Sequence, residues 1–254
     1  MQRQDINCFT GNWPFFRLRC NTFEKLKALH SDAGICSGLI SSLEAVFYQD
    51  PYEAELQLAQ LIKGSSYKHA MILNPTLPAW RDDLNRAVRE LNISAVRLMP
   101  GYHGYTLTDP VMDSVAAALR ESQLPLIITL RVRDERTAWM IQPALISTQD
   151  IISFVSKNPD IRVLLTGIRV GEVRKLEPDQ IPWDNLYVDP SIFKEGGIHP
   201  LENAWELEHV RGHILFGSAA PMMELQATIM QIETANISNA EKEQIFASMD
   251  TFLA

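Results

Sequence analysis

Three arginines in or next to predicted strands are the residues best able to bind an anion. Arg97 lies inside an apolar run, Arg131 ends another, and Arg169 follows a third by two residues. A guanidinium group matches a carboxylate or a phosphate with two parallel hydrogen bonds. Unit charges about 8 Å apart repel by about 2 kcal/mol at an effective dielectric of about 20, so an arginine cluster needs a negative partner. We therefore predict that Arg97, Arg131 and Arg169 bind a small anionic molecule, either a carboxylate or a phosphate.

Asp189 and His103 are the candidates for proton transfer. Asp189 ends a short apolar run, and His103 stands next to Tyr102 in a glycine-flanked loop. Imidazole titrates near neutral pH, so His103 could act as both acid and base. We predict catalytic roles for Asp189 and His103 and a substrate contact for Tyr102. A plainer alternative stays open, because a lone loop histidine is often a surface residue and strand-end arginines commonly pair with nearby acids, here Asp189, Glu172, Asp134 and Glu135.

The elements that must position these residues follow a βα rhythm. Short runs rich in Val, Ile and Leu alternate with longer amphipathic stretches, which indicates a parallel sheet covered by helices. We predict eight strands, at 4–9, 36–41, 69–74, 95–99, 126–131, 162–167, 186–189 and 214–217. Helices are predicted at 50–61 and 109–121, where Asp precedes Pro, at 221–235, and from the capping box at Ser238 to about residue 250.

Length and composition fix the class of protein. With 254 residues and 46% hydrophobic content, the chain is long enough for one α/β barrel, so we predict a single domain over residues 1–254. A net charge of −8 argues against a nucleic-acid partner. The chain shows neither a secretion signal nor a membrane span, and its three separated cysteines indicate no disulfide framework or zinc knuckle. We expect a cytoplasmic protein, with a homodimer as a possible assembly.

Several segments resemble motifs of the amidohydrolase superfamily, in the amidohydrolase-related (amidohydrolase 2) branch. They are Asp5 to Gly11, Val96 to Tyr105, Leu186 to Ser191, and Ile214 to Pro221, and the resemblance covers nearly the whole length. It implies a single (β/α)8 TIM-like barrel of the metal-dependent hydrolase type, with the site at the carboxyl ends of the strands.

The positions where the family carries metal ligands hold other residues in this chain. The resemblance expects Asp-x-His-x-His-x-Gly at the start and Gly-Ser/Thr-Asp-x-Pro near the end, with a histidine on the fifth and on the sixth strand. The degenerate metal-ligand positions are Asn7, Phe9, Thr129, Gly167 and Ala219. Such residues bind a divalent ion poorly, and Ala219 also removes the expected base. We predict a chain with no stoichiometric divalent metal and no cofactor. The alternative is an unfamiliar site built from His103, Asp189 and Glu172.

Side-chain alternation, set against the family's inward positions, predicts which arginines face the barrel interior. Arg97 shares its face with Ala95 and Met99, Arg131 with Ile127 and Thr129, and Arg169 with Leu165 and Gly167. The three guanidinium groups should therefore converge at the mouth. The aromatic segment 11–16 is either a lid over that mouth or a packing plug.

Two classes of function follow from these residues. The first is a metal-independent hydrolase or lactonase acting on a small carboxylated compound, in which arginines hold the carboxylate and Asp189 or His103 moves protons. The second is a catalytically inactive pseudoenzyme that binds an anionic metabolite or a protein partner. The arginine cluster favours the first class or a binding role, and Ala219 in place of the usual aspartate favours the second.

Overall fold

Seven parallel strands form the sheet that carries the polar residues at its carboxyl end. The computed structural model describes residues 2–133, 140–193, 199–247 and 249–254. Neighbouring strands along the chain are neighbours in the sheet, in the order β1-β2-β3-β4-β5-β6-β7. The strands are β1 (Arg3–Thr10), β2 (Ile35–Ser42), β3 (Lys68–Leu73), β4 (Ile93–Leu98), β5 (Leu126–Thr129), β6 (Val163–Thr166) and β7 (Leu186–Val188).

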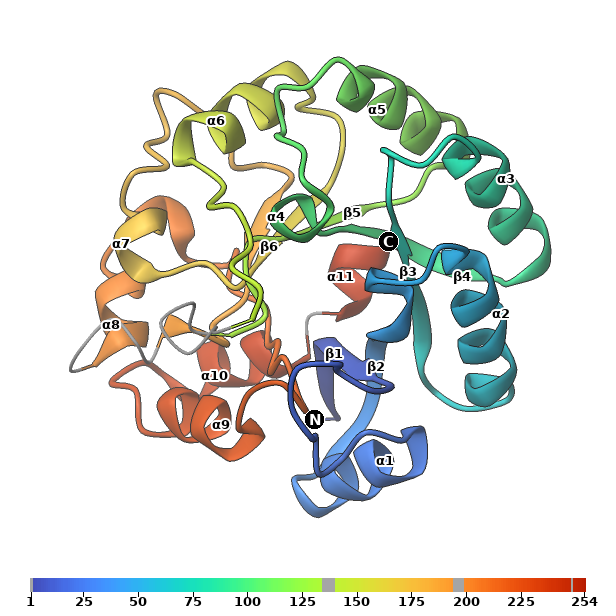
Figure 1. Cartoon of the computed structure of the whole chain (residues 1–254). Helices are drawn as coiled ribbons and strands as arrows, with labels where there is room; N and C mark the ends of the chain where they lie inside the picture. The colour runs from blue at the N-terminus through green and yellow to red at the C-terminus, as the bar shows by residue number, and fades with distance from the viewer. Residues whose placement is uncertain (1, 134–139, 194–198, 248) are drawn as a thin grey trace.

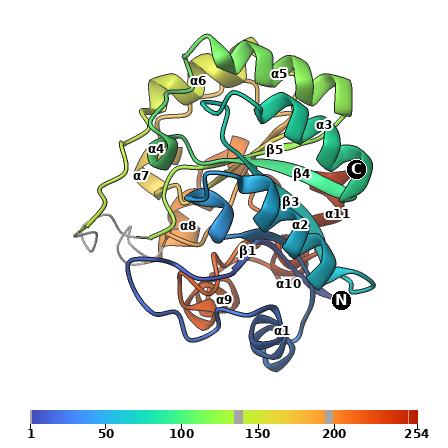
Figure 2. The same ribbon diagram turned by 45° about the vertical axis from the view of Figure 1, so that its right-hand side comes forward.

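Most helices surround this sheet as an outer ring, and α4 and α11 lie nearer its centre (Figure 1). They are α1 (Phe23–Asp32), α2 (Pro51–Ile62), α3 (Trp80–Glu90), α4 (Pro100–His103), α5 (Val111–Ser122), α6 (Thr148–Lys157), α7 (Val170–Val173), α8 (Pro200–Trp205), α9 (Leu225–Glu233), α10 (Asn239–Phe246) and α11 (Met249–Leu253), with 3₁₀ turns at Glu44–Val46 and Glu208–Val210. Figure 2 shows α3, α5 and α6 on one side of the sheet and α1, α9 and α10 on the opposite side. No helix in the part of the chain described here is long and apolar enough to cross a membrane.

Local capping chemistry accounts for the helix starts that the sequence predicts. Asp50 accepts a hydrogen bond from the Tyr52 N–H at the start of α2, and Ser238 and Glu241 form the predicted capping box of α10. The second Asp-Pro pair behaves differently, because Asp109 turns back to the backbone N–H and hydroxyl of Thr106 and α5 begins at Val111. The predicted final helix is in fact two, α10 and α11.

The predicted eighth strand, 214–217, is an irregular segment in the structure. Residues 213–220 are hydrogen-bonded to both edge strands, through Val188 of β7 and through Ile6, Asn7 and Phe9 of β1. Only isolated bridges form, Val188 with Ile214 and Cys8 with Ala220. Ala219 has a φ of +56°, which bends the chain away from a regular ladder. The prediction of a TIM-like α/β fold is confirmed, whereas the prediction of a regular eighth strand at 214–217 is wrong.

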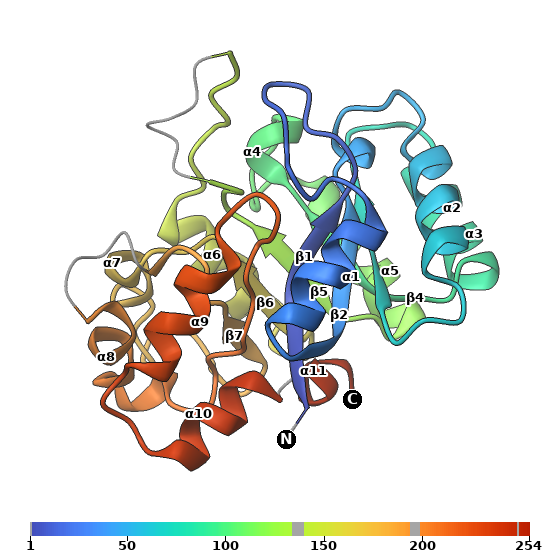
Figure 3. The ribbon, with the colours of Figure 1, turned by 90° about the horizontal axis from the view of Figure 1, so that it is seen from below.

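One buried side chain from each of the seven strands, and one from segment 213–220, fill the amino-terminal end of the interior. We call this set the interior floor, and it comprises Ile6, Leu39, Ala70, Ala95, Ile127, Leu164, Tyr187 and Leu215, together with Met249 and Phe252 of α11. Figures 1 and 3 show α11 at the centre of the ring and at this end of the sheet. The larger cluster lies between the sheet and the outer helices. The C-terminal helix is therefore part of the core that supports the site.

Replacing Phe252 by Ala should lower the free energy of unfolding by about 3–5 kcal/mol, because Phe252 is fully buried in the interior floor. Chemical denaturation measures this change. Thr251→Ala, at an exposed position of the same helix, is the matched control and should shift stability by less than about 0.5 kcal/mol. Equal effects of the two substitutions would contradict a supporting role for α11.

Candidate functional site

Arg97 of β4 is a fully buried cation that neutral groups hold in place. Its Nε donates to Ser41 Oγ at 2.8 Å, and its Nη1 donates to Asn7 Oδ1 at 2.9 Å and to Thr129 Oγ1 at 2.8 Å. The guanidinium carbon lies 4.6 Å from the centre of the Phe9 ring. Within the described residues, Nη2 is buried without a hydrogen-bond partner. Arg97 therefore keeps one donor nitrogen unused.

The strands place these groups one layer above the interior floor. Ser41, Arg97 and Thr129 each lie two positions beyond a floor residue, so alternation brings them to the same inward face. Thr166 of β6 joins the layer, because its hydroxyl donates to Thr129 Oγ1 at 2.9 Å. The inward orientation predicted for Arg97 is therefore confirmed.

Three of the five positions at which the family resemblance expects metal ligands contact Arg97 directly. Asn7 and Thr129 accept its hydrogen bonds, and Phe9 offers its ring. A fixed guanidinium thus lies among the side chains where the family resemblance expects metal donors. An amide, a hydroxyl and a phenyl ring beside a positive charge do not fit a divalent cation.

Asp189, directly after β7, is the buried carboxyl of the same network. Asn7 Nδ2 donates to its Oδ2 at 2.6 Å, while the Gly167 N–H and the Ser191 hydroxyl donate to its Oδ1, both at 3.1 Å. Burial raises the pKa of Asp189 from the usual 3.8 to about 7, although the hydrogen bonds and the charge of Arg97 act in the opposite direction. Burial likewise lowers the pKa of Arg97 to about 10, so it stays protonated at neutral pH. Asp189 can therefore gain or lose a proton near pH 7.

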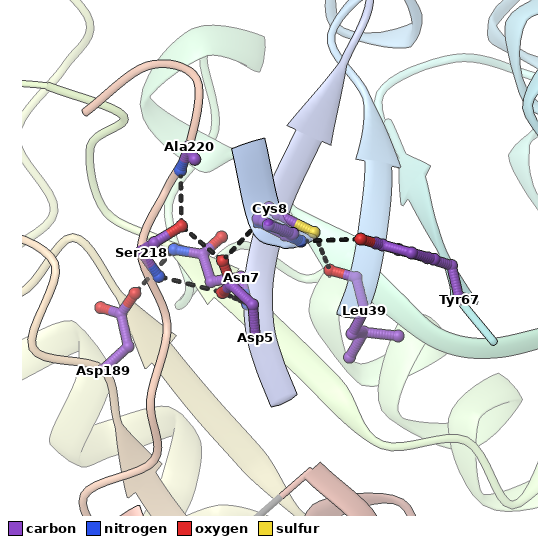
Figure 4. A network of polar contacts seen from close by, with 9 residues as sticks. Asp5, Asn7, Cys8, Leu39, Tyr67, Asp189, Ser218 and Ala220 are labelled. Atoms are coloured by element: carbon purple, nitrogen blue, oxygen red, sulfur yellow. Dashed lines mark hydrogen bonds and ion pairs between the residues drawn. The ribbon is translucent and has the colours of Figure 1, made fainter. Parts of the chain in front are cut away.

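Asn7 joins the cation to the carboxyl, and its amide orientation is fixed by chemistry. A guanidinium only donates, so the carbonyl oxygen of Asn7 faces Arg97 and its NH₂ group faces Asp189. Figure 4 shows Asn7 and Asp189 in this contact. Gly217 leaves room for the pair, since a Cβ there would lie 2.7 Å from Asp189 Oδ2 and 2.8 Å from Asn7 Cβ.

Arg131 has an internal carboxylate partner, as the plainer sequence interpretation allowed. Its Nη1 and Nη2 each donate to one oxygen of Glu172 at 2.7 Å, and Nη1 also donates to the Gly167 carbonyl at 2.6 Å. Arg131 is 4% exposed and Glu172 is 22% exposed, so the arginine is buried while its carboxylate partner keeps some contact with water. Asp134 and Glu135, the other acids considered at this rim, lie outside the described residues.

The alternation predicted for β6 is wrong by one residue. Leu164 lies in the interior floor, and Leu165 lies in the cluster under the helices, so Thr166 rather than Gly167 points inward. Gly167 has a φ of +67°, and a Cβ there would lie 2.0 Å from the Arg131 carbonyl oxygen. No larger residue fits at position 167. Arg169 is half-buried beyond this turn, where its backbone N–H donates to Glu172, so the inward alternation does not extend to it.

His103 and Tyr102 both contact the buried cluster that contains Phe9 and Trp13. His103 Nε2 lies 3.0 Å from the Val46 carbonyl oxygen, and burial lowers the pKa of this imidazole. The neutral ring therefore donates from Nε2 at neutral pH. Tyr102 packs edge-on against Trp13, with 5.6 Å between ring centres, and against Phe47 at 6.2 Å.

An aromatic cover packs against the buried cluster that contains Phe9, whose ring contacts Arg97. We use this name for Trp13, Phe15, Phe47 and Tyr102, whose rings make edge-to-face contacts. Trp13 is only 6% exposed and shares a buried cluster with Phe9 and Ala219. In the structure, segment 11–16 packs into this cluster, as a closed lid and a packing plug both would. The composition predicted an apolar segment here, but no local signal identified Phe47 as part of it.

Asp189→Asn should change how stability depends on pH. A carboxyl whose folded-state pKa is about 7 favours the folded state while protonated, so its contribution is complete below about pH 4 and is lost as pH rises to about 7. The step from 3.8 to about 7 corresponds to on the order of 4 kcal/mol. Unfolding free energies measured across pH 4–8 should therefore fall for the parent chain relative to Asp189→Asn. Exposed Asp179→Asn is the control, and a parallel profile for Asp189→Asn would refute the raised pKa.

Comparison with solved structures identifies relatives in fold. No family model and no curated protein matches the sequence. A dihydroxybenzoic acid decarboxylase from a Polaromonas species, solved with manganese and 2-nitroresorcinol, superposes with a TM-score of 0.73 at 16% identity, covering 99% of this chain and 96% of that one. A manganese-containing 5-carboxyvanillate decarboxylase from Novosphingobium aromaticivorans gives 0.73 at 13% identity, with coverage of 99% and 96%.

A 2,6-dihydroxybenzoate decarboxylase from Rhizobium gives a TM-score of 0.72 at 14% identity, covering 100% of this chain and 98% of that one. Each likeness extends over nearly the full length of both chains. At these identities the likeness shows the fold, and the chain therefore shares the α/β TIM-like fold of these enzymes.

Proposed function

We propose that this chain is a metal-independent, amidohydrolase-type hydrolase that acts on a small carboxylated compound, of which a lactone is the simplest class. The observation that carries the proposal is the hydrogen-bonded chain from Arg97 through Asn7 to Asp189. It holds a permanent cation and a carboxyl that titrates near pH 7 in one buried network. These are the electrophile and the proton carrier that a hydrolytic site needs.

The proposed chemistry uses only side chains of this network. The unused Nη2 of Arg97 donates to the ligand carboxylate or to the oxyanion that develops at the attacked carbonyl. The carboxylate of Asp189 takes a proton from water as that water attacks the carbonyl carbon, and it returns the proton to the leaving oxygen. Because Arg97 is fully buried, the ligand reaches it only when the aromatic cover moves.

The mouth supports an aromatic or otherwise flat carboxylated ligand. When the aromatic cover moves, its rings and Phe9 would flank the buried cation with apolar surface, which suits a ring with a carboxylate at one edge. The three decarboxylases reported above are each named for a carboxylated aromatic compound, which agrees with this class. Predicted substrate contacts of Arg131, Arg169 and Tyr102, and a catalytic role for His103, extend the proposal.

A second candidate is a catalytically inactive binding protein with the same fold. It is favoured because polar groups of the site already have hydrogen-bond and ion-pair partners within the protein. Both Asp189 oxygens accept hydrogen bonds within the protein, and Glu172 already neutralises Arg131. Ala219, where the family's aspartate is expected, offers no proton carrier. The expectations of a cytoplasmic homodimer without a nucleic-acid partner apply to both candidates and stay predictions.

A ligand screen with two variants separates the candidates. Substituted benzoates and carboxylated lactones should raise the melting temperature of the parent chain in proportion to the logarithm of their concentration. Asp189→Asn should keep this binding but lower lactone turnover by about 10²-fold or more. Arg97→Lys, which keeps the charge but loses the planar fork, should weaken binding by about tenfold or more.

Arg81→Lys, at an exposed ion pair with Glu121 that includes no residue of the site, is the matched control and should change neither value. Binding without turnover in the parent chain would favour the binding protein. The absence of both binding and turnover with every carboxylate tested would overturn both candidates.

A further inference from the structure

A second group of ligating side chains lies on the opposite face of β1 from Arg97. Asp5 and Cys8 come from β1 and His30 from α1, and all three are fully buried. One donor atom of each, a carboxylate oxygen, the thiol sulfur and an imidazole nitrogen, lies within 4.8 Å of the other two. Figure 4 shows Asp5 and Cys8 together with Tyr67 beside them. The candidate hydrolytic site uses none of these three residues.

An irregular step in β1 creates this arrangement. The register between β1 and β2 shifts between Asp5 and Cys8, so Asn7 turns inward while Asp5 and Cys8 face α1. Cys8 lies in the cluster under the outer helices. The same short strand therefore serves the interior and the outer layer.

Neighbouring groups already orient the carboxylate and the imidazole. Asp5 Oδ1 accepts the N–H groups of Asn7 and Ser218, both at 3.0 Å, and Oδ2 accepts the Ser218 hydroxyl. His30 Nδ1 lies 2.8 Å from the Tyr67 hydroxyl. His30 Nε2 lies 3.2 Å from Asp5 Oδ2, yet among the described residues it has no partner in hydrogen-bond geometry. A buried imidazole nitrogen without a hydrogen bond thus lies next to the carboxylate, and the thiol of Cys8 completes the group of donors.

We infer that Asp5, Cys8 and His30 form a buried site for a divalent transition-metal ion, with Zn²⁺ the ion whose preferences the donors match. Zinc binds thiolate, imidazole and carboxylate at about 2.0 to 2.3 Å in a tetrahedron, which places donor atoms roughly 3.5 Å apart. The 3.2 Å between Asp5 and His30 already meets this spacing. Ion binding releases the Cys8 proton to solvent, and thiolate and carboxylate then balance the two positive charges.

The second layer of contacts fits a metal-binding histidine. Such histidines normally hydrogen-bond through the other ring nitrogen, here to Tyr67, and their carboxylate partners are themselves held by hydrogen bonds, here from Ser218. The bound ion would join α1 to β1 and, through Ser218, to segment 213–220. The sequence analysis predicts a chain without a divalent metal. With an ion at this site, that prediction would hold only for the mouth of the sheet.

Cobalt provides a direct probe of the site in the full-length protein. Protein produced in medium with Co²⁺, and separately with Zn²⁺, should carry about one ion per chain by elemental analysis. The cobalt form should show a thiolate-to-metal charge-transfer band in the near ultraviolet. Cys8→Ser should lose the band and most of the ion, while His30→Gln should lower the metal content several-fold. Cys36→Ser, at an exposed cysteine of β2, is the matched control and should keep both.

Circular dichroism checks that each variant is folded. If Cys8→Ser does not fold, the metal content of His30→Gln tests the inference instead. A folded parent chain without stoichiometric ion, or an unchanged band in Cys8→Ser, would overturn the inference. The network of Arg97, Asn7 and Asp189 shares no side-chain donor with this site. A variant that loses the metal but still binds benzoate would therefore separate this inference from the proposed function.

Discussion

The buried charge of Arg97 is the constraint around which the carboxyl end of the sheet is organised. An ion removed from water costs several kcal/mol unless dipoles replace its hydration. Here the dipoles come from Ser41, Asn7 and Thr129, and the ring of Phe9 supplies a negative face. These residues come from three strands, β1, β2 and β5. The charge therefore fixes the composition of a whole layer rather than of one contact.

The interior is stacked in three layers with different chemistry. An apolar floor reaches up to the polar layer of Arg97, and the aromatic cover lies above it. Apolar walls on both sides lower the local dielectric, which strengthens every polar contact in the middle and penalises an unpaired charge. The same burial moves the pKa of Asp189 to about 7. A carboxyl suited to proton transfer is thus a physical consequence of where the layer lies.

β1 connects these layers to the outside of the sheet. Asn7 and Phe9 turn toward Arg97, whereas Asp5 and Cys8 turn toward α1. Ser218 donates to Asp5, and the neighbouring Ala219 N–H donates to the Asn7 carbonyl. Backbone hydrogen bonds with Ile6, Asn7 and Phe9 therefore hold the irregular segment next to β1, and the Asp5 side chain adds an acceptor at Ser218.

The sequence by itself determined the βα order, the caps of α2 and α10, and the inward face of Arg97, because these depend on local spacing and alternation. Only the tertiary structure decided the phase of β6, since four consecutive buried residues show no alternation that could indicate which side faces inward. It also decided the link from Arg97 to Asp189 through Asn7 and the meeting of His30 with Asp5 and Cys8. These contacts join residues far apart in the chain, and their distances are set by how strands and helices pack, which no local pattern encodes.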